Sequence, residues 1–379
     1  MNWEKGNVFD LCEINPENIS RNYPHDFITY YDISSVGSGV VTVNDEIPLS
    51  DAPSRAKRVV RNNDTILATV RPGNRTFYYF KTAFENSIAS TGFAVLRPKA
   101  DITDPRFLYY LVSEPGFTAY LVAYEQGANY PAVNPEIIGG KRIEFPPLQT
   151  QRRIASILSA YDDLIENNLR RIKLLEEKAF AGYKLLVKSE KFKLEELFDT
   201  SSGGTPSRTN AEYFTGEINW FKSKELADSI LLESEEKITE QAVDKSSAKL
   251  FPAGSVIMAM YGATIGKLGL LSQPSTTNQA CCAIIQKDEI ASNYYILNWL
   301  IENREYVLSF RMGAAQENIS QQVIRNLLVS IPKVRDLKIF NQEMKPIYQL
   351  IKNLHQQNTK LREARDIFLP RLMSGEIAV

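Results

Sequence analysis

The sequence predicts an α+β protein in which two similar mixed α/β domains are separated by two long antiparallel helices that form a coiled coil with pseudo-twofold symmetry. Three observations predict this class. The two halves of the chain share short matching segments in the same order, each half ends in a long helical pattern of apolar residues, and the two patterns are similar in length. We expect domains at residues 1–147 and 191–334, and helices at residues 148–190 and 335–379.

The internal repeat is visible in pairs of segments at a nearly constant offset. Residues 28–31 resemble residues 218–221, and residues 64–68 resemble residues 255–259. The latter two runs are apolar, and each follows a turn, at residues 62–63 and 253–254, which favours buried strands. Further matches are Gly127 with Gly313, Ala128 with Ala314, Ile138 with Ile324 and Pro146 with Pro332.

The two helices are predicted from apolar residues that recur every three or four positions. In the first helix these are Ile154, Leu158, Tyr161, Ile165, Leu169, Ile172, Leu175, Ala179 and Leu186. In the second, which we expect from about residue 337 to residue 372, they are Phe340, Met344, Ile347, Ile351, Leu354, Leu361, Phe368 and Leu372. A long helix with one apolar stripe is not stable alone in water, so we expect the two to pair. The alternative is that each packs only onto its own domain. Pro346 predicts a kink or a start in the second helix.

Bulk composition restricts the function classes. The net charge is −1, so a role in nucleic-acid binding requires local clusters of charge. The chain has three cysteines without a CxxC spacing and two histidines, which argues against a zinc site and for a reducing compartment. The N-terminal residues lack the pattern of a signal peptide, and the longest weakly polar run, residues 256–271, is too short to span a membrane. We therefore expect a cytoplasmic protein.

Motifs of common enzymes are absent from the sequence. Residues 262–267 resemble a phosphate loop, but the glycines are too close together and Leu268 stands where a Ser or Thr would bind magnesium. Gly37 and Gly39 lack the third glycine of a dinucleotide-binding fingerprint, and residues 133–136 depart from the motif of an amino-methyltransferase. No HExxH or GxSxG motif occurs. We expect a non-catalytic chain that belongs to a larger assembly.

Basic side chains gather between residues 55 and 99, where nine face only two acidic ones. Arg71, Asn74 and Arg75 lie on a loop directly after an apolar run. Arginine pairs with guanine edges and asparagine with adenine edges in the major groove, so we expect these three residues to read bases. Arg58, Arg61 and Lys81 are expected to contact phosphates. The alternative is a solvated basic surface.

The second half has a weaker version of this cluster. No acidic residue occurs between Lys245 and Lys287, and the matching loop covers residues 261–267. We expect Tyr261, Thr264 and Lys267 to contact bases there, and Arg208 and Lys249 to contact phosphates. Residues 201–207 form either a plain linker turn or a contact loop. Because the two loops differ in sequence, we expect a target in two unlike parts separated by a fixed gap.

Four segments carry a resemblance to a known family. They are Tyr31-Asp32-Ile33-Ser34, Gly203-Gly204-Thr205-Pro206-Ser207, the entry to the first helix from residue 143 to residue 163 with its Pro-Pro-Leu-x-x-Gln-x-x-Ile pattern, and residues 369–377 near the C-terminus. With these segments the chain resembles, over essentially its whole length, the specificity subunits of Type I restriction-modification systems.

The resemblance implies a pair of target recognition domains, each reading half of an asymmetric, bipartite DNA site. It also implies that the helices set the gap and dock two modification subunits, which methylate adenine with S-adenosylmethionine, while an ATP- and magnesium-dependent restriction subunit completes the nuclease. Cofactors would then bind to the partner subunits and none to this chain. Docking residues implied at the first helix are Gln151, Arg152, Arg153, Asp162 and Asp163.

One segment departs from the family pattern. At residues 331–337 the second proline and the glutamine are missing, so the resemblance does not imply equal docking at the two helices. Three other functions stay open at this point. They are the specificity subunit of a related combined cut-and-modify system, a single-chain methyltransferase or nuclease, and a scaffold that binds only proteins.

Overall fold

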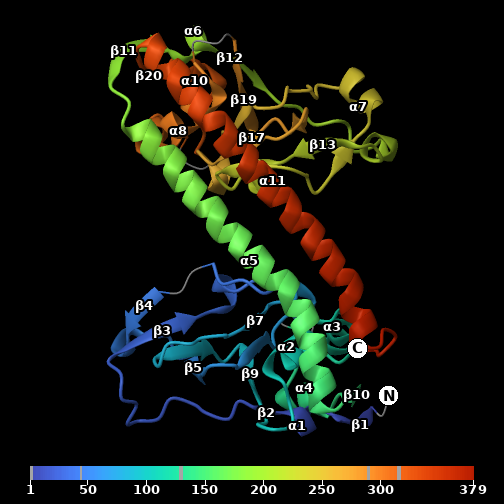
Figure 1. The fold of residues 1–379 in the computed structure, drawn as a ribbon. Coiled ribbons are helices and arrows are strands. Elements are labelled where there is room, and N and C mark those ends of the chain that lie inside the picture. The colour runs from blue at the N-terminus through green and yellow to red at the C-terminus, as the bar shows by residue number, and fades with distance from the viewer. Residues whose placement is uncertain (1–2, 43–44, 128–130, 288–290, 314–316) are drawn as a thin grey trace. The chain divides into compact units, whose positions relative to one another are not determined.

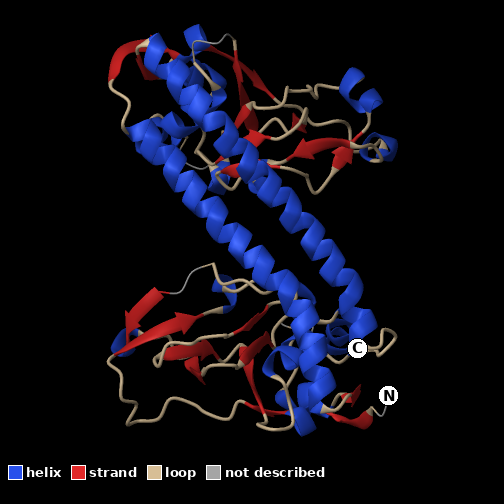
Figure 2. Ribbon diagram, in the orientation of Figure 1, coloured by secondary structure: helices blue, strands red, loops and turns tan. Residues whose placement is uncertain are grey.

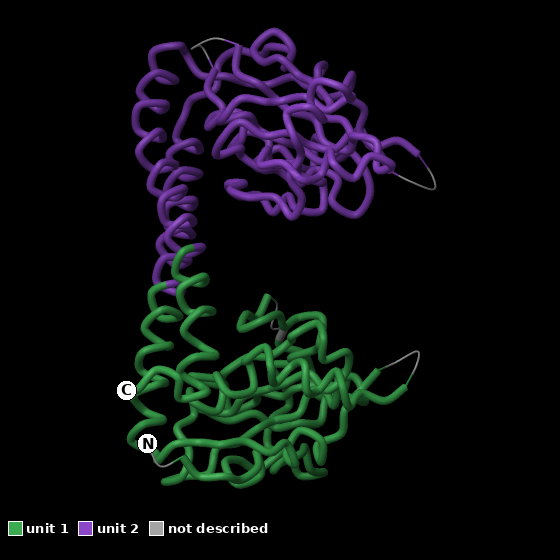
Figure 3. The backbone as a smooth tube through the Cα atoms, turned by 90° about the vertical axis from the view of Figure 1, so that its right-hand side faces the viewer, with its two compact units in different colours: residues 1–164, 360–379 green, residues 165–359 purple. Residues whose placement is uncertain are grey.

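The computed structural model describes residues 3–42, 45–127, 131–287, 291–313 and 317–379 (Figures 1 and 2). The chain forms two compact units (Figure 3). Unit 1 contains residues 1–164 and 360–379, and unit 2 contains residues 165–359. Each unit combines one mixed α/β domain with a section of each of two long helices, α5 (Leu148–Lys184) and α11 (Val334–Met373). The predicted fold class is therefore confirmed.

Unit 1 contains two four-stranded sheets, with strand orders β2-β9-β6-β7 and β4-β3-β8-β5, and a β1-β10 pair, among its described residues. The strands are β1 (Glu4–Asn7), β2 (Cys12–Ile14), β3 (Phe27–Tyr31), β4 (Asp45–Pro48), β5 (Ala56–Val59), β6 (Thr65–Ala68), β7 (Phe77–Tyr79), β8 (Ser87–Ser90), β9 (Phe93–Pro98) and β10 (Arg142–Phe145). The helices are α1 (Val8–Leu11), α2 (Pro105–Ser113), α3 (Pro115–Ala123) and α4 (Pro135–Gly140), with 3₁₀ turns η1 (Ile33–Ser35), η2 (Leu49–Asp51) and η3 (Pro72–Asn74).

Unit 2 repeats this plan with sheets β12-β19-β16-β17-β14 and β15-β13-β18 and a β11-β20 pair among its described residues. The strands are β11 (Lys188–Lys193), β12 (Phe198–Ser202), β13 (Ile218–Phe221), β14 (Ser229–Leu231), β15 (Lys237–Ile238), β16 (Val256–Ala259), β17 (Leu268–Leu271), β18 (Thr276–Thr277), β19 (Cys281–Gln286) and β20 (Leu328–Pro332). The helices are α6 (Leu194–Leu197), α7 (Glu240–Asp244), α8 (Asn293–Glu302), α9 (Arg304–Leu308) and α10 (Gln321–Arg325), with 3₁₀ turns η4 (Ala211–Phe214), η5 (Ser223–Glu225) and η6 (Gly262–Thr264).

The strand pairing confirms the internal repeat. Strands β3 and β13 each pair antiparallel with one neighbour and parallel with the other. Strands β6 and β16 each lie between two antiparallel neighbours, and all four residues of each are buried, so their sequences are apolar except for Thr65 of β6. The turns before them use positive φ angles, 71° at Asn63 and 85° at Gly254. Of the other matched pairs, Ile138 and Ile324 are both fully buried, whereas Ala128 and Ala314 lie outside the described residues.

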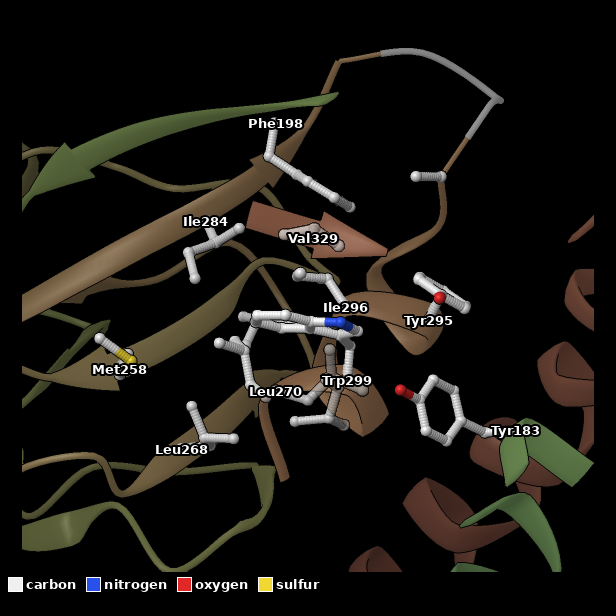
Figure 4. Close-up of a cluster of buried hydrophobic side chains, with 14 of the residues drawn as sticks. Tyr183, Phe198, Met258, Leu268, Leu270, Ile284, Tyr295, Ile296, Trp299 and Val329 are labelled. Carbon is white, nitrogen blue, oxygen red and sulfur yellow. The ribbon is translucent and has the colours of Figure 1, made fainter. Parts of the chain in front are cut away.

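Each unit has its own apolar core, to which both long helices contribute. In unit 1, Ile154 and Leu158 of α5 and Leu372 of α11 pack in one cluster with side chains of the domain. In unit 2, Trp299 lies in a cluster of side chains from β16, β17, β19 and α8 that also contains Tyr183 of α5, whose ring is 5.4 Å from that of Tyr295 (Figure 4). The alternative in which each helix packs only onto its own domain is therefore wrong.

The two helices also pair with one another, antiparallel, within each unit. In unit 1, the ring of Tyr161 stacks on that of Phe368 with centroids 6.2 Å apart, and Arg365 Nη1 lies 2.6 Å from Asp162 Oδ1. In unit 2, Asn168 Nδ2 donates to Asn358 Oδ1 at 2.9 Å. Residues later in α5 contact residues earlier in α11, as expected for an antiparallel pair. The predicted pairing is therefore confirmed.

Two details of the predicted helices are corrected. Leu169 is 38% exposed, and the neighbouring Asn168 occupies the position between the helices instead. The pattern of apolar residues pointed to Leu169, but a step of three residues from Ile165 places residue 168 on the buried face. Pro346 does not begin α11, which starts at Val334 and continues through it. The buried side chains of Met344 and Ile347 on either side of this proline hold the helix against unit 2.

Candidate nucleic-acid interface

The predicted base-reading loop of unit 1 connects the ends of β6 and β7. Arg71 and Arg75 flank the 3₁₀ turn η3, and both adopt left-handed backbone conformations, with φ of 48° and 54°. Such a conformation costs a residue other than glycine about 1–2 kcal/mol. The surrounding structure imposes it, since Arg71 N donates to Pro131 O at 2.8 Å and Arg75 N donates to Pro72 O at 3.0 Å. Strained positions of this kind are enriched at functional sites.

The three predicted base-reading side chains of this loop differ in their surroundings. Arg71 and Asn74 are exposed. Arg75 is half-buried, and its guanidinium donates to Ser113 O at 2.8 Å and lies 5.8 Å from the centroid of the Phe77 ring. Arg71 and Asn74 are therefore better placed than Arg75 to meet a DNA base.

In unit 1, the basic side chains that we expect to contact phosphates have acidic or polar partners that the local sequence did not indicate. Arg61 forms two hydrogen bonds with the Glu17 carboxylate, at 2.7 and 3.2 Å. Lys81 lies 3.8 Å from Asp163. Arg58 is half-buried, donates to an Asn18 side-chain oxygen at 3.0 Å, and has a pKa lowered by burial. Acidic partners far away in the sequence thus reduce the basic character of residues 55–99.

The buried carboxylate of Asp64 neutralises a further arginine of this cluster. Arg97 donates to both Asp64 oxygens, at 3.0 and 2.8 Å, and the backbone N–H of Arg61 donates to the same carboxylate at 2.8 Å. Although these hydrogen bonds act in the opposite direction, burial raises the pKa of Asp64 above its ordinary value. This ion pair anchors the turn before β6, so Arg97 stabilises the domain rather than the interface.

The matching loop of unit 2 follows β16 and contains η6. Gly262 and Gly266 have φ of 71° and 77°, conformations that favour glycine. Tyr261 and Thr264 are half-buried, and Lys267 is exposed but lies 3.0 Å from Asp228. Burial alone would raise the pKa of Asp228, but hydrogen bonds from Arg304 and Lys267 lower it below its ordinary value. The loop therefore presents small side chains and one lysine that is already paired.

The predicted phosphate contacts of unit 2 are also partly engaged. Arg208 pairs with Glu236 at 2.5 Å, and its guanidinium lies 4.2 Å from the centroid of the Phe214 ring. Hydrogen bonds from Arg208 and Lys222 lower the pKa of Glu236 to about 2. Lys249 is exposed and donates to Ser201 Oγ at 2.9 Å. Both cations thus already hold a partner within unit 2, and each keeps further N–H donors for a phosphate.

Residues 201–207 are not a plain linker turn, because hydrogen bonds attach the segment to the domain, and their role as a contact loop stays a prediction. Gly203 N donates to Cys281 O at 3.1 Å, and Gly204 N donates to Thr277 O at 2.9 Å. Trp220 Nε1 donates to Gly204 O at 2.9 Å. A Cβ on Gly204 would lie 2.1 Å from Ser247 O, so only glycine fits there. The two glycines attach this segment to the domain and place Arg208 at the surface.

In each unit the structure brings the predicted base-reading residues together on one loop, whereas the predicted phosphate contacts are dispersed. Arg58 lies on β5, Arg61 in the turn before β6, and Lys81 after β7. In unit 2, Arg208 lies in the segment between β12 and η4, and Lys249 in the segment before β16. The assignments to bases and phosphates stay predictions, since contacts with DNA decide them.

Of the predicted docking residues on α5, Arg152 and Arg153 are exposed. Gln151 is 1% exposed, and its amide binds Asp104 N, Ile102 O and Pro146 O, at 3.0, 3.1 and 2.9 Å. The prediction that the Gln151 side chain directly contacts a partner is therefore wrong. This side chain is buried and links the start of α5 to the domain. The Pro-Pro-Leu-x-x-Gln-x-x-Ile pattern that contains Gln151 could not distinguish a buried role from an exposed one.

The two aspartates of α5 also bind within unit 1. Asp162 accepts hydrogen bonds from Tyr110 Oη at 2.5 Å and from Arg365 Nη1 at 2.6 Å. Asp163 accepts two from Arg106, at 3.1 and 3.2 Å. These partners lie far from α5 in the sequence, so no local signal could have indicated them. Asp162 is half-buried, and Asp163 is exposed enough to contact a partner as well.

The described part of the chain contains no group of three or more His, Cys, Asp or Glu side chains placed to hold a metal ion. The three cysteines are unpaired and buried, and burial raises the pKa of Cys12, Cys281 and Cys282 to about 12. At neutral pH these thiols are protonated and therefore poor nucleophiles. In the same residues we find no helix that is both long and apolar enough to cross a membrane.

The fold defines the class as a protein with a duplicated mixed α/β domain and two long paired helices, in which each copy has a different loop at the same place. The family model described as "Type I restriction modification DNA specificity domain" matches residues 1–177 and again residues 187–363. The chain belongs to this family, as a Type I restriction-modification specificity subunit, and the predicted resemblance is confirmed.

Individual relatives agree with this assignment. The HindI specificity subunit of Haemophilus influenzae is 22% identical over 99% of each chain. The MjaIX specificity subunit of Methanocaldococcus jannaschii is 25% identical over 83% of this chain and 78% of its own. The crystal structure of the Type I restriction-modification system S subunit from M. genitalium is 14% identical, covers 98% of this chain and 96% of its own, and has a TM-score of 0.57, which supports the fold.

Proposed function

We propose that this chain is the DNA-recognition subunit of a Type I restriction-modification complex. It binds a bipartite, asymmetric DNA site with its two domains, and it positions adenine methyltransferase subunits and an ATP-driven restriction subunit on that site. The observation that carries this proposal is the occurrence of two dissimilar loops, residues 71–75 and 261–267, at equivalent places in the repeat.

The chemistry of these loops supports an asymmetric target. The first loop presents Arg71 and Asn74, which suit guanine and adenine edges, respectively. The second presents Thr264 and Lys267 on a glycine-rich turn that allows close approach of the backbone. Domains with the same fold but different loop side chains bind different half-sites, and the paired helices α5 and α11 keep the two half-sites at a fixed gap.

The exposed surface of α5 supports docking of protein partners. Ile157 and Leu164 are 38% and 52% exposed, although both are large apolar side chains. Arg152 and Arg153 are exposed near the start of the same helix. Apolar residues with basic neighbours on a helix are typical of a protein interface. We infer that modification subunits bind here and carry S-adenosylmethionine, and that ATP and magnesium bind to the restriction subunit.

A pair of variants tests DNA reading. The target is first located by methylome sequencing of a host with and without the gene. Arg71→Ala, in the complex assembled with the modification subunits, should weaken binding by about 1–3 kcal/mol on the target and relax the preference at one base pair. Lys81→Ala should weaken binding to every sequence alike and reduce the salt dependence by about one counterion. Gel shifts on matched and mutated sites, at several salt concentrations, measure both effects.

The charge-matched control is Lys5→Ala, because Lys5 is 84% exposed on β1, in a different part of unit 1 from the loop. It should leave affinity and sequence preference unchanged. Equal losses on all sequences for Arg71→Ala would reject its base-reading role. Binding of the wild-type complex without sequence preference would reject the proposed function as a whole.

A further inference from the structure

The helices α3 and α9 end at equivalent places in the repeat, and each is followed by an exposed aromatic side chain. In unit 1 the rings of Tyr120 and Tyr124 lie with centroids 4.7 Å apart, and in unit 2 those of Tyr306 and Phe310 lie 5.1 Å apart. The outer ring of each pair is well exposed, 55% for Tyr124 and 40% for Phe310. Both pairs have the same spacing of four residues.

The inner ring of each pair is held by the domain. Tyr120 Oη donates to Ile137 O at 3.2 Å, and the Lys141 ammonium lies 4.5 Å from the centroid of the Tyr120 ring. The ring of Tyr306 packs edge-on against the Trp299 ring at 6.2 Å, although Tyr306 itself is 37% exposed. Each outer ring therefore packs against an inner ring that already has contacts with its domain. This packing reduces the conformational entropy that the outer ring loses when it binds a ligand.

These aromatic pairs lie beside the loops to which we assign base reading. A Cβ on Gly73 would lie 3.6 Å from Val122 Cγ2, and a Cβ on Gly266 would lie 2.9 Å from Leu308 Cδ2. The segment after each helix also joins the strand that leads into the loop, since Val133 N donates to Thr69 O at 2.8 Å and Ile319 N donates to Met260 O at 2.9 Å. Each aromatic pair and its loop are thus parts of one surface.

The occurrence of these rings at equivalent positions of both units distinguishes them from other exposed apolar side chains. Phe27 is 51% exposed in unit 1, but the repeat places Glu217 at the equivalent position in unit 2. Tyr124 and Phe310, in contrast, are aromatic in both copies although the neighbouring loops differ in sequence. Packing does not explain an aromatic ring that stays exposed twice, whereas binding of a ligand common to both units does.

We propose that Tyr124 and Phe310 contact the DNA directly, each next to the bases read by the loop of its own unit, and that their partner is the methyl group of a thymine. This inference rests on the proposed function. Within the major groove the thymine C5-methyl is the apolar feature of the base edges, and aromatic side chains are among its partners. Each half-site would then contain an A·T pair at the position that the ring reaches.

Replacement of thymine by deoxyuridine removes only this methyl group and so provides the test. The full chain, assembled with its modification subunits, is titrated with the mapped target and with duplexes in which each thymine of the first half-site is replaced in turn. We expect one replacement to weaken binding of the wild type about fourfold, the effect of removing one buried methyl group. Tyr124→Ala should lose a similar factor on the thymine target and be insensitive to that replacement.

Two further variants complete the design. Tyr124→Phe keeps the ring and should behave as the wild type, and Phe27→Ala, which removes a ring of similar exposure elsewhere in unit 1, should have no effect. The same titration with Phe310→Ala and the second half-site tests unit 2.

Three results would overturn the inference. The first is wild-type affinity for Tyr124→Ala. The second is a loss for Tyr124→Ala that adds to the loss from every deoxyuridine replacement, because it would indicate an effect on the fold. The third is impaired assembly with the modification subunits on native gels together with unchanged DNA affinity of the assembled fraction, which would assign the ring to a protein contact. A wild-type complex that binds without sequence preference would instead reject the proposed function.

Discussion

The buried amide pair between α5 and α11 in unit 2 leads to a quantitative prediction. Asn168 and Asn358 are 6% and 0% exposed, and Asn168 Nδ2 donates to Asn358 Oδ1 at 2.9 Å. Gln357 Oε1 lies 3.5 Å from the same donor, while Asn358 Nδ2 has no partner among the described residues. The neighbouring positions on the buried faces, Ile165 and Ile172 among them, are apolar.

Replacement of one member should cost stability, and replacement of both should restore it. In Asn358→Leu or Asn168→Leu, the remaining buried amide faces an apolar side chain and loses its hydrogen bond, at a cost of about 1–3 kcal/mol. In the double variant no buried amide is left, and burial of each leucine contributes about 1.5–3 kcal/mol. Overpacking opposes this gain by about 1–3 kcal/mol. The double variant should therefore be at least as stable as the wild type.

Denaturant unfolding of the full chain, followed by far-ultraviolet circular dichroism, measures these differences through a double-mutant cycle. We expect a coupling free energy of about 1–3 kcal/mol between the two positions. Leu174→Ala is the control, because this leucine of α5 is 63% exposed and its loss should change little. Losses that simply add in the double variant would refute the argument that the two amides stabilise one another. A polar pair of this kind sets the register of two helices rather than their stability.

Two further predictions concern unit 2. Gly204→Ala should lower the melting temperature of unit 2, because the new Cβ would lie 2.1 Å from a backbone carbonyl oxygen. The control is Gly140→Ala, which should not affect unit 1, because no atom lies within 4 Å of the new Cβ. Equal effects of the two variants would contradict the steric argument. Burial alone would raise the pKa of Glu302, but hydrogen bonds from Lys184 and Lys188 outweigh it and lower the pKa to about 2. Since this is below the ordinary value of 4.5, the stabilisation is fully present above that pH and is lost as the pH falls through the folded pKa. The difference in unfolding free energy between the wild type and Glu302→Gln should thus be constant near neutral pH and shrink in acid, and a difference that grows in acid would contradict this assignment.

Much of the fold could be predicted from local sequence. The repeat was visible because the same buried strand and the same turn occur twice, as at residues 64–68 and 255–259. The helices were visible because a buried stripe requires an apolar residue every three or four positions. Pro346 predicted a kink or a start in the second helix, whereas α11 starts at Val334 and continues through this proline, with Met344 and Ile347 buried on either side of it.

The candidate site was predicted less completely. The loops were located correctly at the ends of buried strands, but the electrostatics of their surroundings were not. Glu17 and Asp163 pair with cations of the basic cluster in unit 1, and Asp228 does so with Lys267 in unit 2. A count of charges along the sequence cannot include such partners, because the fold and not the sequence brings them within a few ångströms. The aromatic rings beside the loops were missed because no charge or motif marks them.

The sequence by itself determined the duplicated plan, the long amphipathic helices and the family, because each of these is encoded in patterns of neighbouring residues that any copy of the fold must satisfy. Only the tertiary structure decided which polar side chains are available to a partner. Gln151 proved to be buried against its own domain, Arg75 to be held by Ser113, and Tyr124 to be exposed beside the loop at residues 71–75. Burial and hydrogen bonding depend on which segments the fold brings together, and that is a property of the whole chain.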